Sequence, residues 1–256
     1  MPGEATRGLA TLLQLFGITF SVAAFYFVAR VFGPAASPHL AEYGGDYFAF
    51  VLVGIAFGAY QAVGMSAFAE AIRSGQTQGT LEAMLVTPTR LELILASSAL
   101  WSFLQATLQV LVYLAVGALL FGAPLGQANV GTALLTLLLS LLAFSGLGIL
   151  SASVILVTKR GDPITFVFGS LSALLSGVYY PVAVLPAWLQ PLSALLPLTH
   201  ALRALRLALL EGASPAEVAP NLAMLALFAL VVLPGGIWAF RWALRQARRE
   251  GTLTQY

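Results

Sequence analysis

Long apolar runs alternate with short polar segments along the whole chain. Six of these runs extend for about twenty residues or more without an Asp, Glu, Lys or Arg. A run of about 20 apolar residues crosses the hydrocarbon layer of a membrane as a helix, which satisfies its own backbone hydrogen bonds in lipid. We therefore predict six transmembrane helices, over residues 9–29, 47–69, 93–121, 130–157, 164–182 and 221–240.

The composition agrees with a protein that lies almost entirely in a membrane. Hydrophobic residues make up 59% of the 256 residues and charged residues only 9%, whereas soluble chains carry about a quarter charged residues. We predict an all-α, polytopic membrane protein with a single transmembrane domain over residues 1–256. The chain has no cysteine, and it contains neither an H-E-x-x-H motif nor a P-loop. We therefore expect no catalytic residue, no metal site and no ATP hydrolysis by this chain alone.

The positions of the basic residues predict the orientation. With the N-terminus in the cytoplasm, nine of the 12 basic residues fall in inner segments, as the positive-inside rule favours. We expect a multi-pass protein of the cytoplasmic (inner) membrane with both termini inside, and its net charge of +2 does not imply a nucleic-acid partner. The inner basic residues are Arg7, Arg73, Arg90, Lys159, Arg160, Arg241, Arg245, Arg248 and Arg249, and the outer ones are Arg30, Arg203 and Arg206.

The region 183–210 is harder to place. Its apolar run is long enough to make a seventh span, but that would put Arg203 and Arg206 inside the membrane at about 2.5–3.5 kcal/mol each if they were central. A re-entrant or interfacial helix costs less. The i, i+3 spacing puts both arginines on one helix face, with leucines on another. We expect residues 192–210 to form an extracellular re-entrant or interfacial helix before the last span.

Polar side chains recur at helical spacing inside the first three predicted spans. None of the spans contains an ionisable Asp, Glu, Lys or Arg, which argues against a proton-driven carrier. Such stripes face protein, and they can either pack helices together through hydrogen bonds or line a substrate path. For the second possibility the candidates, with two tyrosines near the outer ends, are Gln14, Gln61, Ser102, Gln105, Gln109, Tyr179 and Tyr180.

The polar stretch "RSGQTQGTLEAMLVTPTRLE", residues 73–92, joins two of the predicted spans on the cytoplasmic side. Gly75 and Gly79 interrupt the preceding helix, and a short helix from Thr80 would place Leu81 and Leu85 on one side. This amphipathic helix can either rest on the inner leaflet or dock on a partner protein. Residues 76–87 contain no Lys or Arg, which a helix resting on lipid would prefer, so docking is favoured.

Two segments resemble a known family. "QGTLEAMLVTPTRLELILASSALW" and, about ninety residues later, "SGVYYPVAVLPAWLQPLSALLPLTHALRALR" are similar to the transmembrane permease subunits of the type-2 family of ABC exporters. The resemblance implies six spans, cytoplasmic termini, extracellular re-entrant helices over 183–210 and a coupling helix within 70–92 that contacts an ATPase. The resemblance further implies that the residues that contact the ATPase are Arg73, Gly79, Thr80, Leu81, Glu82, Leu85 and Arg90.

The resemblance also implies partners and a function. Two permease halves, identical or paralogous, pair in the membrane lipid with two separate ABC ATPase subunits, which bind the ATP and Mg that this chain does not. The resemblance implies export outward, and the mostly apolar and aromatic residues of the spans favour an amphiphilic drug-like or lipid cargo over a glycan. Two alternatives remain from the residues alone: a secondary carrier or channel, and a membrane scaffold subunit that transports nothing.

Overall fold

A computed structural model describes residues 2–77, 91–158 and 162–249, and this part of the chain contains helices and no strand. Its five long helices are α1 (Pro2–Ala36), α2 (Tyr47–Thr77), α4 (Leu91–Phe121), α5 (Val130–Thr158) and α9 (Ala219–Arg249). Its shorter elements are η1 (Ser37–Tyr43), α6 (Pro163–Leu175), η2 (Val182–Val184), α7 (Gln190–Ala194) and α8 (Pro197–Leu210).

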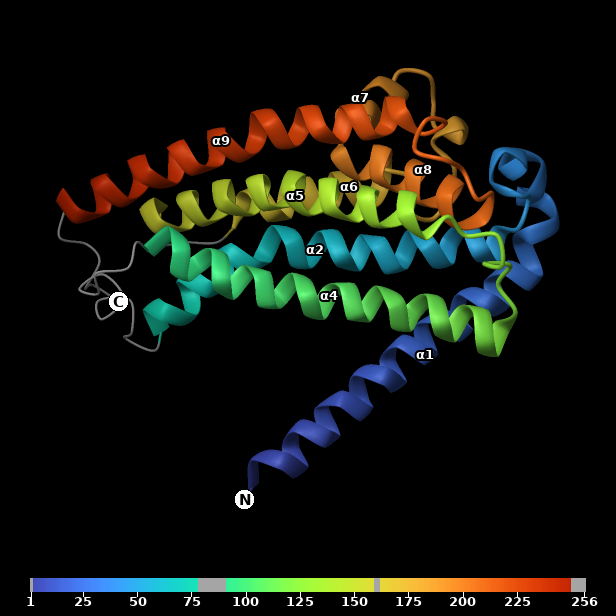
Figure 1. Ribbon diagram of the computed structural model, residues 1–256, viewed down its shortest axis with the longest axis horizontal. Helices are drawn as coiled ribbons and strands as arrows, with labels where there is room; N and C mark the ends of the chain where they lie inside the picture. Colours follow the sequence, from blue (N-terminus) through green and yellow to red (C-terminus); the bar gives the residue numbers. More distant parts are fainter. Residues whose placement is uncertain (1, 78–90, 159–161, 250–256) are drawn as a thin grey trace.

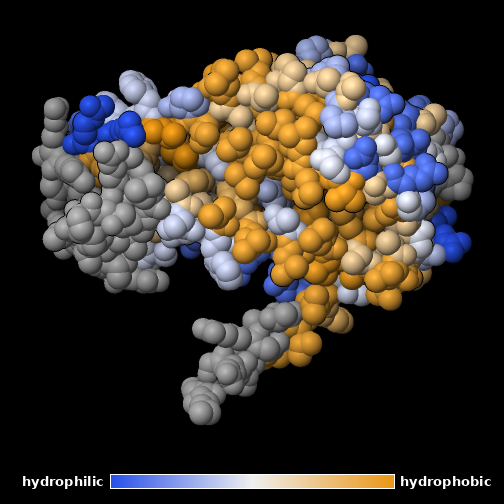
Figure 2. Space-filling view, viewed as in Figure 1, coloured by the Kyte–Doolittle hydropathy of each residue, from blue (hydrophilic) through white to orange (hydrophobic). Residues whose placement is uncertain are grey.

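The long helices form a bundle with α5 near its centre (Figure 1). Helix α5 packs against α9 on one side and α2 on the other, and α4 packs on α2. Helix α1 contacts α2 and α4 near its C-terminal end, while its N-terminal part points away from the bundle. Hydrophobic residues cover the middle of the visible face, and hydrophilic ones gather toward the two ends (Figure 2). This distribution matches a bundle whose middle lies in hydrocarbon.

Five of the six predicted spans are long, apolar helices in the structure. The span predicted over 164–182 differs, because α6 has only 13 residues and ends at Leu175. At 1.5 Å of rise per residue it is about 20 Å long, which is shorter than the hydrocarbon layer of about 30 Å. The chain turns at Gly177, whose φ of 79° suits glycine. The prediction of a continuous helix to residue 182 is therefore wrong.

The segment after α6 folds back against the bundle. Helix α8 packs on α5, α9 and α2. Its Arg203 is exposed, as an interfacial helix requires, but Arg206 is only 3% exposed. The expectation that both arginines share a polar face is therefore wrong for Arg206. Its guanidinium finds two backbone acceptors inside the protein, donating from Nε to the carbonyl of Phe50 at 3.1 Å and from Nη2 to that of Val178 at 3.1 Å.

Helices α5 and α9 approach each other closely at two glycines. A Cβ on Gly146 would lie 2.7 Å from the backbone nitrogen of Leu233, and one on Gly236 would lie 2.7 Å from the carbonyl oxygen of Gly146. Small residues of this kind let helix backbones come together in membranes, where no hydrophobic effect drives helices onto one another. The crossing of Gly146 and Gly236 therefore fixes α9 against the centre of the bundle.

Candidate functional site

The predicted coupling segment begins and ends at one end of the bundle. Helix α2 ends at Thr77 and α4 begins at Leu91, and both lie at the end where α5 finishes, α6 starts and α9 reaches Arg249 (Figure 1). The predicted coupling residues Gly79, Thr80, Leu81, Glu82, Leu85 and Arg90 lie outside the described residues. Their role stays a prediction. The structure describes the two helices that precede and follow this segment, α2 and α4.

Arg73 is the one predicted coupling residue within the described part of the chain. It lies in the last turns of α2, with Nη1 3.8 Å from Oε2 of Glu70. Both side chains are about half exposed or more, at 49% and 67%. An ion pair between exposed side chains contributes at most about 1 kcal/mol. Arg73 therefore presents charge at the end of the bundle, and its exposed ion pair with Glu70 contributes little to holding α2 in place.

The connection from α5 to α6 at the same end is tied by Asp162. Its Oδ1 accepts a hydrogen bond from the backbone N–H of Thr165 at 3.0 Å, which caps the N-terminus of α6. The same carboxylate accepts from the hydroxyl of Ser151 on α5. Pro163 follows at the first helical position, where a proline costs nothing. The sequence Asp-Pro before an apolar run is a helix-start signal that would have identified this cap.

Four of the predicted path residues line one pocket. Gln14 on α1 and Ser102, Gln105 and Gln109 on α4 surround a cavity of about 420 Å³ between these helices, together with Val63 of α2. The polar stripes of the first and third spans therefore face each other. This arrangement fits either of the two explanations given by the sequence, because the side chains could bond across the helices or contact a ligand between them.

Gln61 lies elsewhere. It is 4% exposed on α2, and its Nε2 donates to Oγ of Ser172 on α6 at 2.8 Å. This bond holds two helices together inside the protein. Gln61 also lines a second pocket, of about 320 Å³, which lies between α1, α2 and α6 and includes Tyr179. Four of the predicted path residues therefore line the first pocket, and Gln61 and Tyr179 line the second.

The two tyrosines after α6 have different surroundings. The ring of Tyr179 stacks on Phe25 of α1 with 5.7 Å between centroids, and its backbone carbonyl accepts from the hydroxyl of Tyr47 at 3.2 Å. The hydroxyl of Tyr180 donates to the carbonyl of Leu174 at the end of α6. Tyr180 lines neither of the two pockets. Its bond to Leu174 instead closes the turn that follows the shortened helix.

Sequence reasoning missed two residues that position these elements, Gly146 and Gly236, and it placed Arg206 on an exposed face although the side chain is buried. The sequence does contain a G-x-x-x-G motif, Gly54 to Gly58 on α2, but both of its glycines lie on one helix. No spacing rule could have paired Gly146 with Gly236, because they lie on different helices. The burial of Arg206 could not be predicted, because the carbonyls that accept from it, those of Phe50 and Val178, lie 156 and 28 residues away in the sequence.

The family model for "ABC-2 type transporter" matches residues 5–210. The chain belongs to the ABC-2 type transporter family. It is also similar to the "Probable multidrug ABC transporter permease YbhR" of Escherichia coli strain K12 and to the protein of that name in strain O157:H7, with 31% identity over 123 residues in each. The match covers 48% of this chain and 33% of each relative, so the similarity spans about a third of their length.

As a member of the ABC-2 type transporter family, the chain is a type-2 ABC permease. Its multiple apolar helices and its family together make it a multi-pass membrane protein. The expected resemblance to type-2 ABC permeases is thus confirmed.

Proposed function

We propose that the chain is one permease half of an ATP-driven exporter in the cytoplasmic membrane. The observation that carries the proposal is where α2 ends and α4 begins, at Thr77 and Leu91. Both lie at the same end of the bundle as the end of α5, the start of α6 and the C-terminal end of α9 (Figure 1). A force applied there would reach both helices directly, and α5 through its packing on α2.

The charge distribution supports a cytoplasmic location for that end. Arg241 and Arg245 of α9 lie there with Arg73, and more Lys and Arg follow in the adjoining sequence. The opposite end holds Glu42, Asp46, Glu211 and Glu217, with Arg30, Arg203 and Arg206 as its basic residues. By the positive-inside rule the first end faces the cytoplasm, so both termini and the coupling segment are inside.

The energy source in this proposal is a separate ABC ATPase that binds ATP and Mg²⁺. Glu82 would orient the contact by pairing with a basic residue of that subunit, while Leu81 and Leu85 supply an apolar anchor. Two permease halves, identical or paralogous, would rock against each other when the ATPase subunits close. Shifting a two-state equilibrium from 1:99 to 99:1 needs about 5.5 kcal/mol of differential binding, which a dimer closing on ATP can supply.

The cargo in this proposal is an amphiphilic drug-like or lipid molecule. Two observations support it. The pocket between α1 and α4 combines the amides of Gln14, Gln105 and Gln109 with the apolar side chains of Leu15, Ile18, Leu108 and Val112. The relatives of similar sequence also carry "multidrug" in their names. A mostly apolar wall with a few polar groups suits an amphiphile better than a long glycan.

The decisive experiment is co-purification with an ABC ATPase, followed by reconstitution and measurement of ATP hydrolysis and efflux. We expect Glu82→Arg combined with Leu85→Asp to abolish the complex and the stimulation of hydrolysis. The matched control is Glu217→Arg, an equal charge reversal at an exposed site at the opposite end, which should leave both intact. A complex that survives the double substitution would contradict the docking assignment.

The same preparation separates the alternatives. Transport by this chain alone in vesicles, driven by an ion gradient or leaking, would indicate a carrier or channel. A stable complex without any flux would indicate a scaffold. Because the chain has no native cysteine, a single Thr80→Cys can be labelled in intact cells with a membrane-impermeant maleimide. Labelling from outside would reverse the proposed orientation.

A further inference from the structure

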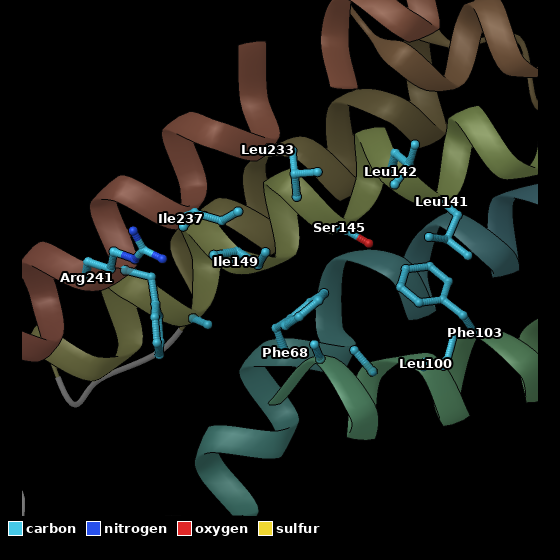
Figure 3. A pocket seen from close by; sticks show the side chains of 14 residues that line it. Phe68, Leu100, Phe103, Leu141, Leu142, Ser145, Ile149, Leu233, Ile237 and Arg241 are labelled. Carbon is cyan, nitrogen blue, oxygen red and sulfur yellow. The ribbon is translucent and has the colours of Figure 1, made fainter. Parts of the chain in front are cut away.

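A third cavity lies away from the α1–α4 pocket, in a groove between α4 and α9 (Figure 3). Its volume is about 330 Å³, and its walls come from α2, α4, α5 and α9. Of its fourteen lining residues only Ser145 and Arg241 carry polar side chains. Helices α4 and α9 are not packed on each other, so the groove is the space left between them over α5.

The groove has a buried floor and an exposed rim. Ala99, Phe103 and Ala152 of the floor are 1–2% exposed, whereas Leu100 of the rim is 64% exposed. Trp101 and Trp238, which follow the lining residues Leu100 and Ile237 in the sequence, are 61% and 68% exposed. The open side of the groove therefore faces the lipid that surrounds the bundle, and it is continuous with the hydrocarbon.

The length of the groove corresponds to one leaflet. Its α5 residues run from Leu141 to Ala152, which at 1.5 Å of rise per residue is about 16 Å of helix. Half of the hydrocarbon layer is about 15 Å. A groove of this length takes an extended acyl chain from the headgroup level to about the middle of the membrane, and it does not continue into the other leaflet.

Basic side chains lie at one end of the groove, and the other end is apolar. Arg241 lies at the end nearest the C-terminus of α9, and Leu141 and Leu142 of α5 lie toward the opposite, apolar end (Figure 3). Arg241 is exposed, and its guanidinium is always charged in proteins. Arg245 adds a second exposed cation one turn further on. Basic sites between membrane helices at this level attract anionic headgroups.

We propose that this groove binds one acyl chain of an anionic phospholipid, with the headgroup phosphate paired with Arg241. The occupant is a resident membrane lipid and not the transported cargo, because the groove opens to the bilayer and its floor offers no polar group besides Ser145. The lipid holds α4 and α9 in their relative positions by filling the gap between them. The site requires no ATPase, so it stands independently of the function proposed above.

The test measures lipid retained by the purified full chain in detergent, by native mass spectrometry during titration with dioleoyl phosphatidylglycerol or dioleoyl phosphatidylcholine. We expect phosphatidylglycerol to bind about fivefold more tightly, the factor given by about 1 kcal/mol for one basic residue near a headgroup. Arg241→Gln should remove this preference. Arg245→Gln removes an equal charge from the same helix but does not line the groove, and should retain most of the preference.

A second pair of variants tests the groove itself. Ala96→Phe places a ring at its exposed rim and should lower the binding of both lipids severalfold, whereas Ala115→Phe, at an exposed site of α4 outside the groove, should not. Size-exclusion profiles and melting temperatures establish that each variant is folded. Equal effects of Arg241→Gln and Arg245→Gln, or equal binding by the two phenylalanine variants, would overturn the proposal.

Discussion

The guanidinium of Arg206 lies over the ring of Phe50, with 3.3 Å between its central carbon and the ring centroid. The same group donates to the carbonyl of Phe50 on α2 and to that of Val178 in the turn after α6. One side chain of α8 therefore joins three parts of the chain. A cation stacked on an aromatic face and bonded to carbonyls is stabilised without a carboxylate partner.

Arg206→Lys should destabilise the protein although it keeps the charge. A lysine ammonium is a point charge without the planar fork, so it cannot reach both carbonyls and stack on Phe50 at once. Burying the lysine ammonium still costs desolvation free energy, but part of the hydrogen bonding and ring stacking that offsets this cost for Arg206 is lost. We expect a loss of about 1–3 kcal/mol, seen as a lower melting temperature in detergent.

The matched control is Arg203→Lys, one turn away on the same helix. Arg203 is about half exposed and pairs with Glu42 at 2.6 Å. Exposed ion pairs contribute at most about 1 kcal/mol, and lysine can keep much of this one. Equal destabilisation by the two substitutions would show that the fork of Arg206 is not what holds α8 in place.

Gly236→Ala should loosen the crossing of α5 and α9. The added Cβ would meet the carbonyl oxygen of Gly146, a backbone atom that cannot rotate away. Overpacking of this kind costs about 1–3 kcal/mol. The neighbouring Gly235 has open space around its Cβ position, so Gly235→Ala should be neutral or slightly stabilising through helix propensity. Melting temperatures of the two variants decide the question.

The sequence predicted the five long membrane helices but not the early end of α6. Five spans were found because each combines sufficient length with an absence of charge. The early end of α6 was missed because the apolar pattern continues through Gly177 to Val182, and hydropathy does not register the backbone turn at Gly177. Length and hydropathy therefore locate membrane helices, but backbone turns inside an apolar run need the structure.

The sequence predicted which polar side chains share one face of α4, and their role in a substrate path stays a prediction. Ser102, Gln105 and Gln109 recur at a helical spacing, so their common face on α4 followed from the sequence, and Gln14 meets them there. The separation of Gln61 did not follow, because its partner Ser172 is 111 residues away. Arg206 was misplaced for the same reason, since its acceptors lie 156 and 28 residues away. Periodicity in the sequence predicts which residues share one face of a helix, but it does not predict which other helix that face contacts.

The turn before α9 should loosen in acid. Two hydrogen bonds from Ser214, one from its backbone N–H and one from its hydroxyl, lower the pKa of Glu217 below its usual 4.5. A carboxyl whose pKa is depressed on folding stabilises the fold above its unfolded pKa and loses that contribution as the pH falls through the folded value. We expect amide exchange over 212–219 to increase below about pH 4 relative to Glu217→Gln. Equal pH profiles for both proteins would contradict this.

Substitutions of Gln105 and Gln61 should distinguish a polar side chain that binds the transported molecule from one that stabilises the fold. Gln105 lines the open pocket between α1 and α4, whereas the amide of Gln61 is bonded to Ser172. Gln61→Leu should leave the Ser172 hydroxyl without its partner and cost about 1–2 kcal/mol of stability. Gln105→Leu should leave the melting temperature unchanged and instead alter efflux of the transported molecule in the reconstituted complex. A side chain that contacts the transported molecule can change transport without changing the stability of the fold. If Gln105→Leu instead lowered stability as much as Gln61→Leu and left efflux unchanged, the α1–α4 pocket would be a packing contact and not part of the transport path.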